Sequence, residues 1–142
     1  MTEPGTAYGY SGEGFEWLRR AVEIKSGRTW EDLARDYVFV PARMTSTSFL
    51  YPSASQDRVA ARYDATGEPV TAEPHGEANA AANLMTTAGD YARFLIFVMG
   101  GGGLAEDLAA DMLSPQIVTG SNKAFGLGWE ILEDVRGNED AI

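Results

Sequence analysis

The chain has 142 residues and a formal net charge of −10, with 44% hydrophobic and 23% charged residues. This mix is that of a globular domain, and the length suits one domain or a large part of one. The negative charge argues against nucleic acid and anionic membranes as partners, because phosphate binding needs clustered Lys and Arg. The absence of Cys excludes disulfides, thiolate catalysts and Cys-based zinc sites. It is compatible with an oxidising or a reducing compartment, so the localisation stays open.

Metal, cofactor and membrane functions find little support in the sequence. The only His, His75, cannot build a multi-His metal centre, and its place between Pro74 and Gly76 is typical of a surface loop. The longest apolar run covers residues 94–99, whereas a membrane span takes about 20 residues. We therefore expect no metal, no cofactor and no transmembrane segment.

Hydrophobic periodicity predicts a first helix at about residues 12–25. Its apolar stripe is formed by Phe15, Leu18 and Val22. Glu16 and Arg20 are expected to form an i,i+4 pair on its outer face. Gly27 follows the helix, in the position where a left-handed cap is cheap.

A second helix is predicted at about residues 30–38, capped by Thr29 and stopped by Pro41. Its expected buried stripe is Trp30, Leu33, Ala34 and Tyr37. Residues 44–55 are rich in Ser and Thr and are expected to form a loop. Residues 59–63 and 68–71 flank the turn residues 65–67, which predicts a short hairpin. Residues 73–83 are rich in small side chains and are expected to be irregular.

The third and fourth helices complete the helical part. Thr87 is expected to cap the third, which runs to about Met99 with Asp90 in its first turn as a structural residue. Apolar side chains surround this helix, so it should be largely buried. The Gly residues at 100–103 end it rather than form a phosphate loop, since they follow a helix and no Lys-Ser or Lys-Thr comes next. The fourth helix has the stripe Leu104, Leu108 and Met112 and is closed by Pro115.

A strand is predicted at about residues 125–135, where Phe125, Leu127, Trp129 and Ile131 alternate with other residues. A single strand cannot satisfy its own backbone groups. Its partners are therefore expected outside this chain or in another copy of it. The expected bulky core members are Trp17, Trp30, Trp129, Phe94 and Phe97.

Three stretches, in order, resemble one protein family. Residues 4–15 (PGTAYGYSGEGF) resemble the P-G-T-x-x-x-Y-S-x-x-G-(Y/F) segment of the serine β-lactamase superfamily, which includes class C β-lactamases, D-Ala-D-Ala carboxypeptidases and related esterases. Residues 26–30 and 40–47 resemble its SGK-S and P-L-G-M-T-x-T segments. Residues 81–94 (AANLMTTAGDYARF) resemble its A-A-S-L-x-T-T-x-x-D-Y-A-x-F segment. Residues 126–129 (GLGW) fit the strand that follows, and together the matches cover nearly the whole chain.

The resemblance implies a serine hydrolase with an acyl-enzyme mechanism. In this family a Ser of a Ser-x-x-Lys motif is acylated, and the Lys and the Tyr of a Tyr-x-Asn motif share proton transfer. A later (K/H)-x-G segment binds the substrate carboxylate. Tyr10 corresponds to the catalytic Tyr, and Ser11 and Gly12 to the next two positions, which makes them the candidate substrate-binding residues. Gly12 departs from the pattern, because Asn is usual there and binds a substrate amide. This favours an esterase- or peptidase-like parent over an efficient β-lactamase.

Two motifs of the family do not occur in this sequence. No Ser is followed by Lys three residues later, and neither Lys-x-Gly nor His-x-Gly occurs at a matching position. We therefore expect the chain to be an internal piece of a longer enzyme and inactive alone. Ser11 could be mistaken for the nucleophile of a Gly-x-Ser-x-Gly elbow, but Glu13 breaks that pattern and a helix cap is the better interpretation.

The sequence thus predicts a mainly helical α+β fragment: the helical domain of a β-lactamase/transpeptidase-like fold, with one terminal strand and a short hairpin. Residues 11–115 would form the helical part, and residues 125–135 a strand of the missing sheet. The intact parent would act on a small acyl substrate. The alternative is a binding or assembly module that descends from this family and catalyses nothing. Exposed apolar surface on the third helix and the last strand would favour self-association of the fragment.

Overall fold

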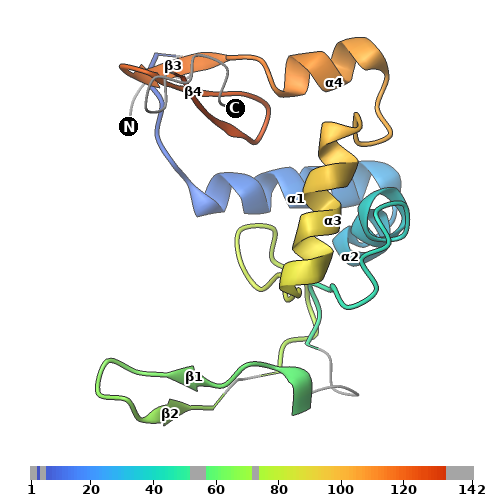
Figure 1. Ribbon diagram of the computed structural model, residues 1–142, viewed down its shortest axis with the longest axis vertical. Helices are drawn as coiled ribbons and strands as arrows, with labels where there is room; N and C mark the ends of the chain where they lie inside the picture. The colour runs from blue at the N-terminus through green and yellow to red at the C-terminus, as the bar shows by residue number, and fades with distance from the viewer. Residues whose placement is uncertain (1–2, 4–5, 52–56, 72–73, 134–142) are drawn as a thin grey trace. The chain divides into compact units, whose positions relative to one another are not determined.

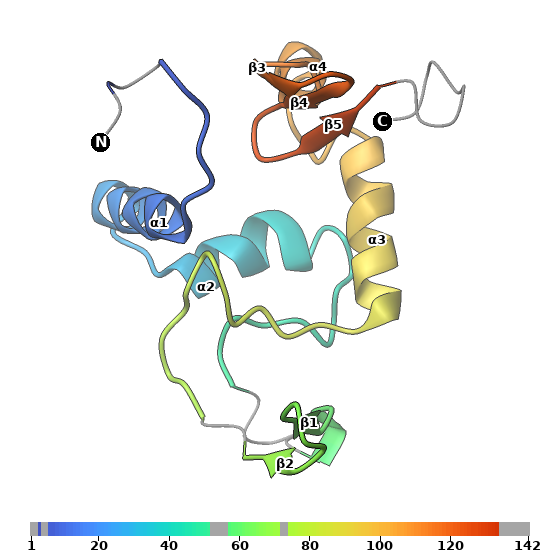
Figure 2. The ribbon, with the colours of Figure 1, turned by 90° about the vertical axis from the view of Figure 1, so that its left-hand side faces the viewer.

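The computed structural model describes residues 3, 6–51, 57–71 and 74–133. The chain divides into two compact units. The central unit comprises Ser11–Ile96, and the terminal unit comprises Met1–Tyr10 together with Phe97–Ile142. Figures 1 and 2 show the elements in two perpendicular views.

Helix α1 spans Gly12–Ser26 and begins and ends as predicted. Ser11 caps its start, and Gly27 ends it with a left-handed φ of 67° while donating its N–H to Glu23 O. The predicted apolar stripe is not buried, since none of the α1 residues is buried and Leu18 is 54% exposed. The helix is therefore stabilised locally by its caps and ion pairs more than by burial.

The second helix has two parts. α2 spans Trp30–Ala34 and begins at the predicted Thr29 cap, whose hydroxyl accepts the Asp32 N–H. It continues as a π-helical turn, η1, over Arg35–Phe39. Pro41 lacks the N–H that an α-helix would donate at this point, so the chain leaves the helix through wider turns. The expected buried stripe is wrong at Tyr37, which is 67% exposed, whereas Phe39 is buried.

The core of the central unit follows this turn. Its buried apolar side chains are Phe39, Ala42 and Met44, and the ring of Phe49 lies 6.1 Å from Phe39 and 6.2 Å from Trp30. Glu31 is also buried, and its carboxylate accepts hydrogen bonds from Ser48 Oγ at 3.0 Å and Phe49 N at 2.8 Å. A buried carboxylate with these partners holds the following loop against α2.

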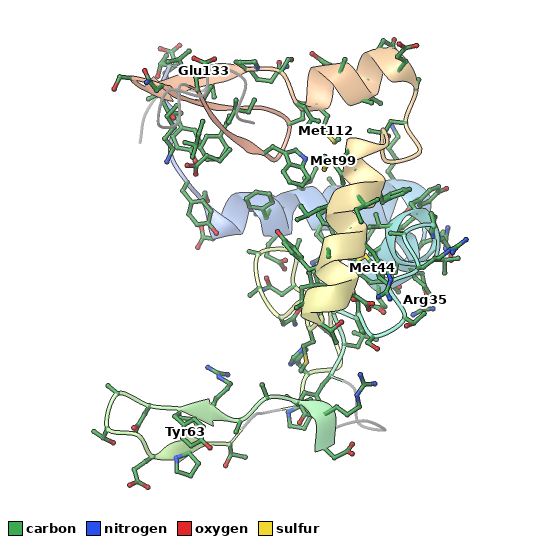
Figure 3. The ribbon with its side chains drawn as sticks, in the orientation of Figure 1. Arg35, Met44, Tyr63, Met99, Met112 and Glu133 are labelled. Atoms are coloured by element: carbon green, nitrogen blue, oxygen red, sulfur yellow. The ribbon has the colours of Figure 1, made fainter. Side chains whose placement is uncertain are left out.

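The predicted hairpin is present but short. β1 (Arg62–Tyr63) and β2 (Pro69–Val70) pair antiparallel around a turn in which Asp64 accepts the N–H groups of Thr66 and Glu68. Figure 3 shows Tyr63 on this hairpin. Of the expected loop at residues 44–55, residues 52–55 lie outside the described residues; the rest is irregular apart from a bridge between Ser48 and Met85. Residues 74–83 contain neither helix nor strand, as predicted.

Helix α3 spans Ala88–Met99, and Thr87 caps it by accepting the Asp90 N–H at 3.1 Å. The prediction that this helix is largely buried is wrong. Tyr91 is 47% exposed, Ile96 70% and Met99 82%, and only Asp90 and Val98 are buried. Apolar residues on all faces of a helix predict burial only if other segments of the protein pack against every face.

The predicted single terminal strand is wrong. The terminal unit contains a three-stranded antiparallel sheet, ordered β3 (Ile117–Gly120), β4 (Lys123–Phe125) and β5 (Glu130–Leu132). It follows helix α4, which spans Glu106–Met112. The alternation from Phe125 to Ile131 crosses a chain reversal, where Gly128 has a φ of 87°. The strand partners expected elsewhere are thus in this chain. Residues 134–135 of the prediction lie outside the described residues.

Two further predictions need correction. Trp17 was expected in the core but is 75% exposed, and Trp30, Phe94, Phe97 and Trp129 are only partly buried. His75 is not a freely exposed loop residue, since its Nε2 is buried and its ring lies 6.0 Å from that of Tyr51. Among the described residues, no helix is long and apolar enough to cross a membrane.

Candidate active site

Tyr10 lies on the extended segment that precedes α1, and its side chain is 75% exposed. Two residues earlier in the terminal unit, the Tyr8 ring stacks on Phe125 of β4 at a centroid distance of 4.7 Å. That stack fixes the segment to the sheet, because offset aromatic pairs contribute beyond their buried area. The segment is therefore held at Tyr8 while the Tyr10 side chain stays accessible to solvent.

Ser11 follows Tyr10 and belongs to the central unit. Its backbone is extended, with φ −147° and ψ 110°, and its Oγ accepts the Gly14 N–H at 3.1 Å. This is the geometry of an N-cap, as the sequence predicted. The cap uses the oxygen as an acceptor, which leaves the hydroxyl proton for a further bond.

Gly12 is the first residue of α1 and lines a groove together with residues of the loop at 79–83. A Cβ placed on Gly12 would lie 3.5 Å from the Ala81 Cβ, an ordinary van der Waals distance. A Cβ at position 12 is thus sterically possible. A surface groove beside Gly12 is lined by Glu13, Glu16, Trp17, Arg19, Arg20, Asn79, Ala81 and Ala82.

Hydrogen bonds fix the loop that forms one wall of this groove. Asn79 Oδ1 accepts the Ala81 N–H at 2.9 Å, and the Asn79 N–H donates to Asn83 Oδ1 at 3.0 Å. Asn83 Nδ2 donates to Glu77 O at 3.0 Å. Asn83 has a φ of 48°, in the left-handed region that Asn tolerates better than most residues. The two asparagines therefore define the course of the loop.

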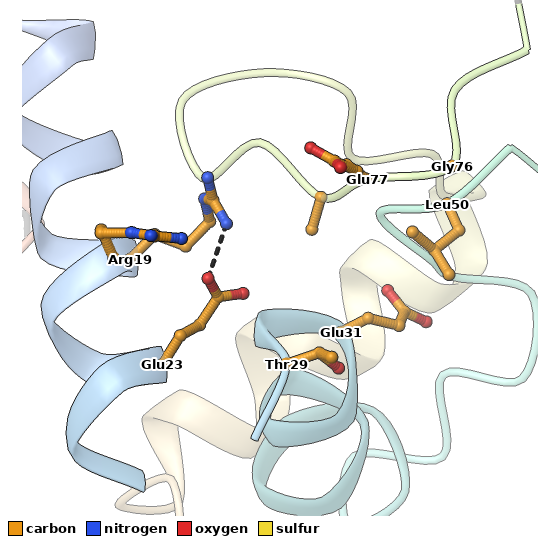
Figure 4. A pocket seen from close by; sticks show the side chains of 9 residues that line it. Arg19, Glu23, Thr29, Glu31, Leu50, Gly76 and Glu77 are labelled. Carbon is orange, nitrogen blue, oxygen red and sulfur yellow. Dashed lines mark hydrogen bonds and ion pairs between the residues drawn. The ribbon is translucent and has the colours of Figure 1, made fainter. Parts of the chain in front are cut away.

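A network of charged side chains joins this loop to α1 and α2. Arg19 pairs with Glu16 at 3.0 Å and with Glu23 at 2.7 Å, and Glu23 accepts the Trp30 N–H at 2.8 Å. Glu16 also accepts the Ala80 N–H. The predicted partner of Glu16, Arg20, is wrong, because the i,i+3 and i,i+4 bonds of Arg19 occupy both carboxylates. Figure 4 shows Arg19 and Glu23 at a second cavity, which Thr29, Glu31 and Leu50 also line.

The hydrogen bonds of this network shift the pKa values of Glu16 and Arg19. The hydrogen bond from Arg19 lowers the pKa of Glu16 below its ordinary value; partial desolvation opposes it and the Ala80 N–H adds to it. The same hydrogen bond raises the pKa of Arg19. Both groups are therefore charged at neutral pH and hold each other in place rather than exchange protons.

Sequence reasoning found the segment at residues 10–12 but not the opposite wall of the groove. Asn79 lies within residues 73–83, which show no periodicity that would single it out. The signal that could have found it is the pair Asn79 and Asn83 within a run of alanines, since Asn favours local side chain to backbone bonds. Within the described ranges, no group of three His, Asp or Glu side chains is placed to hold a metal.

Solved structures of penicillin-binding proteins share the fold of this chain. The Beta-lactamase family profile matches residues 1–137. The chain therefore belongs to the β-lactamase family.

Individual relatives agree with this assignment. Penicillin-binding protein 4 of Amycolatopsis lactamdurans is 30% identical over 97 residues, which is 64% of this chain and 26% of that protein. D-amino acid amidase from Ochrobactrum anthropi SV3 matches with a TM-score of 0.70 at 25% identity, over 93% of this chain and 42% of the amidase. The octameric penicillin-binding protein homologue from Pyrococcus abyssi matches with a TM-score of 0.73 at 18% identity, over 92% and 31%. The chain thus spans less than half the length of each.

Proposed function

We propose that this chain supplies the Tyr-bearing segment and the helical wall of the cleft of a serine hydrolase that works through an acyl-enzyme. The observation that carries the proposal is Tyr10, a 75% exposed hydroxyl-bearing side chain on the residue before the α1 cap. A buried Tyr at this position would indicate a structural role in packing. An exposed one, on a segment fixed by Tyr8, is accessible to a substrate.

The division of labour follows from the chemistry of acyl transfer. A Ser hydroxyl is a weak nucleophile until a neighbouring group takes its proton. A Tyr hydroxyl is ordinarily protonated at neutral pH, so it can relay protons only beside a cation such as Lys. The 142 residues contain no Ser-x-x-Lys. We therefore assign the nucleophile and its Lys to a segment outside this sequence, and proton transfer to Tyr10.

Gly12 supports an esterase- or peptidase-like substrate rather than efficient β-lactam turnover. It has no side chain to bind the amide that Asn binds at this position in class C enzymes. The relatives are consistent with such a range, since one is a penicillin-binding protein and another an amidase of D-amino acids. The proposed substrate is a small acyl compound such as a peptide, an amide or an ester.

The test uses the protein encoded by the complete reading frame. We expect a Ser-x-x-Lys motif before Tyr10 and a (K/H)-x-G motif after residue 142, and covalent labelling of that Ser by a fluorescent penicillin or a fluorophosphonate. Tyr10→Phe should slow labelling by about 10²- to 10⁴-fold, the usual contribution of a proton-transfer group. Tyr8→Phe is the matched control, because it keeps the ring stack and should label normally.

The alternative, a non-catalytic binding or assembly module, makes opposite predictions in the same experiment. A reading frame without Ser-x-x-Lys, or full labelling of the Tyr10→Phe variant, would contradict the catalytic proposal. Labelling of the 142-residue chain at Ser11 would also contradict it, because the nucleophile would then lie within the helix cap.

A further inference from the structure

The groove beside Gly12 lacks the carboxamide donor that an Asn at position 12 would provide, but it contains the carboxamide of Asn79. Position 12, where α1 begins, has no side chain, although a Cβ there would fit at an ordinary contact distance from Ala81. Across the groove lies Asn79, whose carboxamide carries the same donor that an Asn at position 12 would offer. The neighbouring Ala81 links the two sites, because its Cβ faces Gly12 and its N–H is bound by Asn79.

We propose that Asn79 is the substrate-binding residue that replaces the missing Asn at position 12, with its Nδ2 donating to a carbonyl oxygen of the acyl substrate. This rests on the proposed function. The substrate class is an acyl donor that bears a second carbonyl, such as an N-acylamino acid ester or a peptide, with an apolar substituent.

The orientation of the Asn79 carboxamide is fixed by its own hydrogen bond. Oδ1 accepts the Ala81 N–H at 2.9 Å, and this choice sets which end of the amide is nitrogen. The backbone of Asn79 is held in turn by Asn83. Within the described part of the chain Nδ2 has no hydrogen-bond partner. A pre-oriented donor without a protein partner costs little reorganisation when a carbonyl binds.

The wall that carries Asn79 is anchored to the helix that carries Gly12. Glu16, one turn after Gly12, accepts the N–H of Ala80, which directly follows Asn79. Arg19 holds Glu16 in that position. The distance across the groove is therefore set by charged hydrogen bonds, which are stronger than neutral ones. A substrate would meet a preformed site rather than have to order a loop.

The other groove residues indicate the kind of group that fits. Trp17 is 75% exposed and offers an indole face to an apolar or aromatic substituent. Arg19 is engaged by Glu16 and Glu23, so it is not available to a ligand carboxylate. Beside the charged side chains of Glu13 and Arg20, which also line it, the groove offers one neutral donor and one apolar face, which suit an acylamino group with an apolar substituent.

The test compares two esters in the protein encoded by the complete reading frame. The p-nitrophenyl ester of N-acetylphenylalanine, tried as both enantiomers, has the second carbonyl, whereas p-nitrophenyl 3-phenylpropanoate lacks it. Asn79→Asp keeps an acceptor for the Ala81 N–H, removes the donor and adds a negative charge. We expect it to lower kcat/KM for the acetamido ester by at least about 3- to 15-fold, the effect of losing one neutral hydrogen bond. The matched ester should change less than about twofold.

Rescue separates binding from structure. Gly12→Asn in the Asn79→Asp background should restore kcat/KM for the acetamido ester, because it returns a carboxamide to the same groove. Asn83→Asp is the structural control, since it loses the bond to Glu77 O and should affect both esters equally. Melting temperatures of all variants establish that they are folded.

The outcomes distinguish the two levels of the proposal. If the unsubstituted protein hydrolyses neither ester and takes up no fluorophosphonate, the proposed function fails and the role of Asn79 fails with it. If it hydrolyses both, and Asn79→Asp affects both esters equally or neither, the serine hydrolase stands and the role of Asn79 is wrong.

Discussion

Asp90 offers a quantitative test of how the α3 start is joined to the preceding loop. The carboxylate is 2% exposed and accepts three hydrogen bonds: from Ser46 N at 2.7 Å, Thr47 Oγ1 at 2.9 Å and Arg93 Nη1 at 2.8 Å. Asp90→Ala removes all three. The unpaired Ser46 N–H costs about 1–3 kcal/mol when water cannot reach it, whereas the Thr47 hydroxyl can donate instead to Thr86 Oγ1, 2.7 Å away, and costs less.

The guanidinium of Arg93 adds little to this sum. Its side chain is 53% exposed and regains water, so its share is below about 1 kcal/mol. Ser46 is near the surface, which favours the lower half of that range. We therefore expect Asp90→Ala to lower the free energy of unfolding by about 2 kcal/mol. Urea unfolding followed by circular dichroism at pH 7 measures it.

The pH dependence of the same difference is a second readout. Burial raises the pKa of Asp90, but the hydrogen bonds from Ser46 and Thr47 and the charge of Arg93 outweigh it, so the pKa lies below its ordinary value of 3.8. A carboxylate with a lowered pKa stabilises the fold fully above its unfolded pKa, and this stabilisation disappears as the pH falls through the folded pKa. The difference in the free energy of unfolding between the native protein and the Asp90→Ala variant should therefore become smaller below pH 3.8. A loss under about 0.5 kcal/mol at pH 7, or a gap that widens in acid, would refute this account.

Three other predictions concern separate features. Ser11→Ala should cost about 1 kcal/mol in urea unfolding through loss of the α1 cap, and Ser11→Asp, which can also cap, should cost less. Gly126→Ala should cost about 1–3 kcal/mol, because a Cβ there would meet the carbonyl oxygens of Met112 and Ser114, whereas Gly76→Ala meets nothing and should be near neutral. The 142-residue chain should self-associate in sedimentation velocity through the exposed face of α3, and Ile96→Lys should weaken it; a strict monomer at all concentrations would contradict this.

The helices could be predicted because their signals are local. Thr29 and Thr87 both accept the predicted cap bonds, and Gly27 takes the left-handed conformation at the end of α1. Caps and periodicity depend on residues within a few positions of each other. Burial could not be predicted in the same way. Trp17 and Ile96 are apolar enough for a core, but their exposure depends on which other segments pack against them.

The sheet was missed for a related reason. Alternation from Phe125 to Ile131 has the period of one strand, yet the chain reverses at Gly128 and the two halves pair as β4 and β5. Two short strands joined by a Gly turn and one longer strand share the same pattern. The turn itself was readable, because Gly126 and Gly128 are breakers inside a strand pattern. Gly126 is needed for close approach to Met112, and a sequence contains no record of that distance.

The candidate site shows the same limit in its chemistry. The motif at Tyr10, Ser11 and Gly12 usually ends in Asn. Judged by that motif alone, Gly12 indicates that binding of a substrate amide is lost. The groove, however, is built from two segments far apart in the chain, and Asn79 offers the donor that position 12 lacks. If the exchange of Asn79 and Gly12 described above restores activity, the amide-binding role belongs to the groove rather than to a position in the motif. A departure from a family pattern then has to be judged against every side chain that faces the same space.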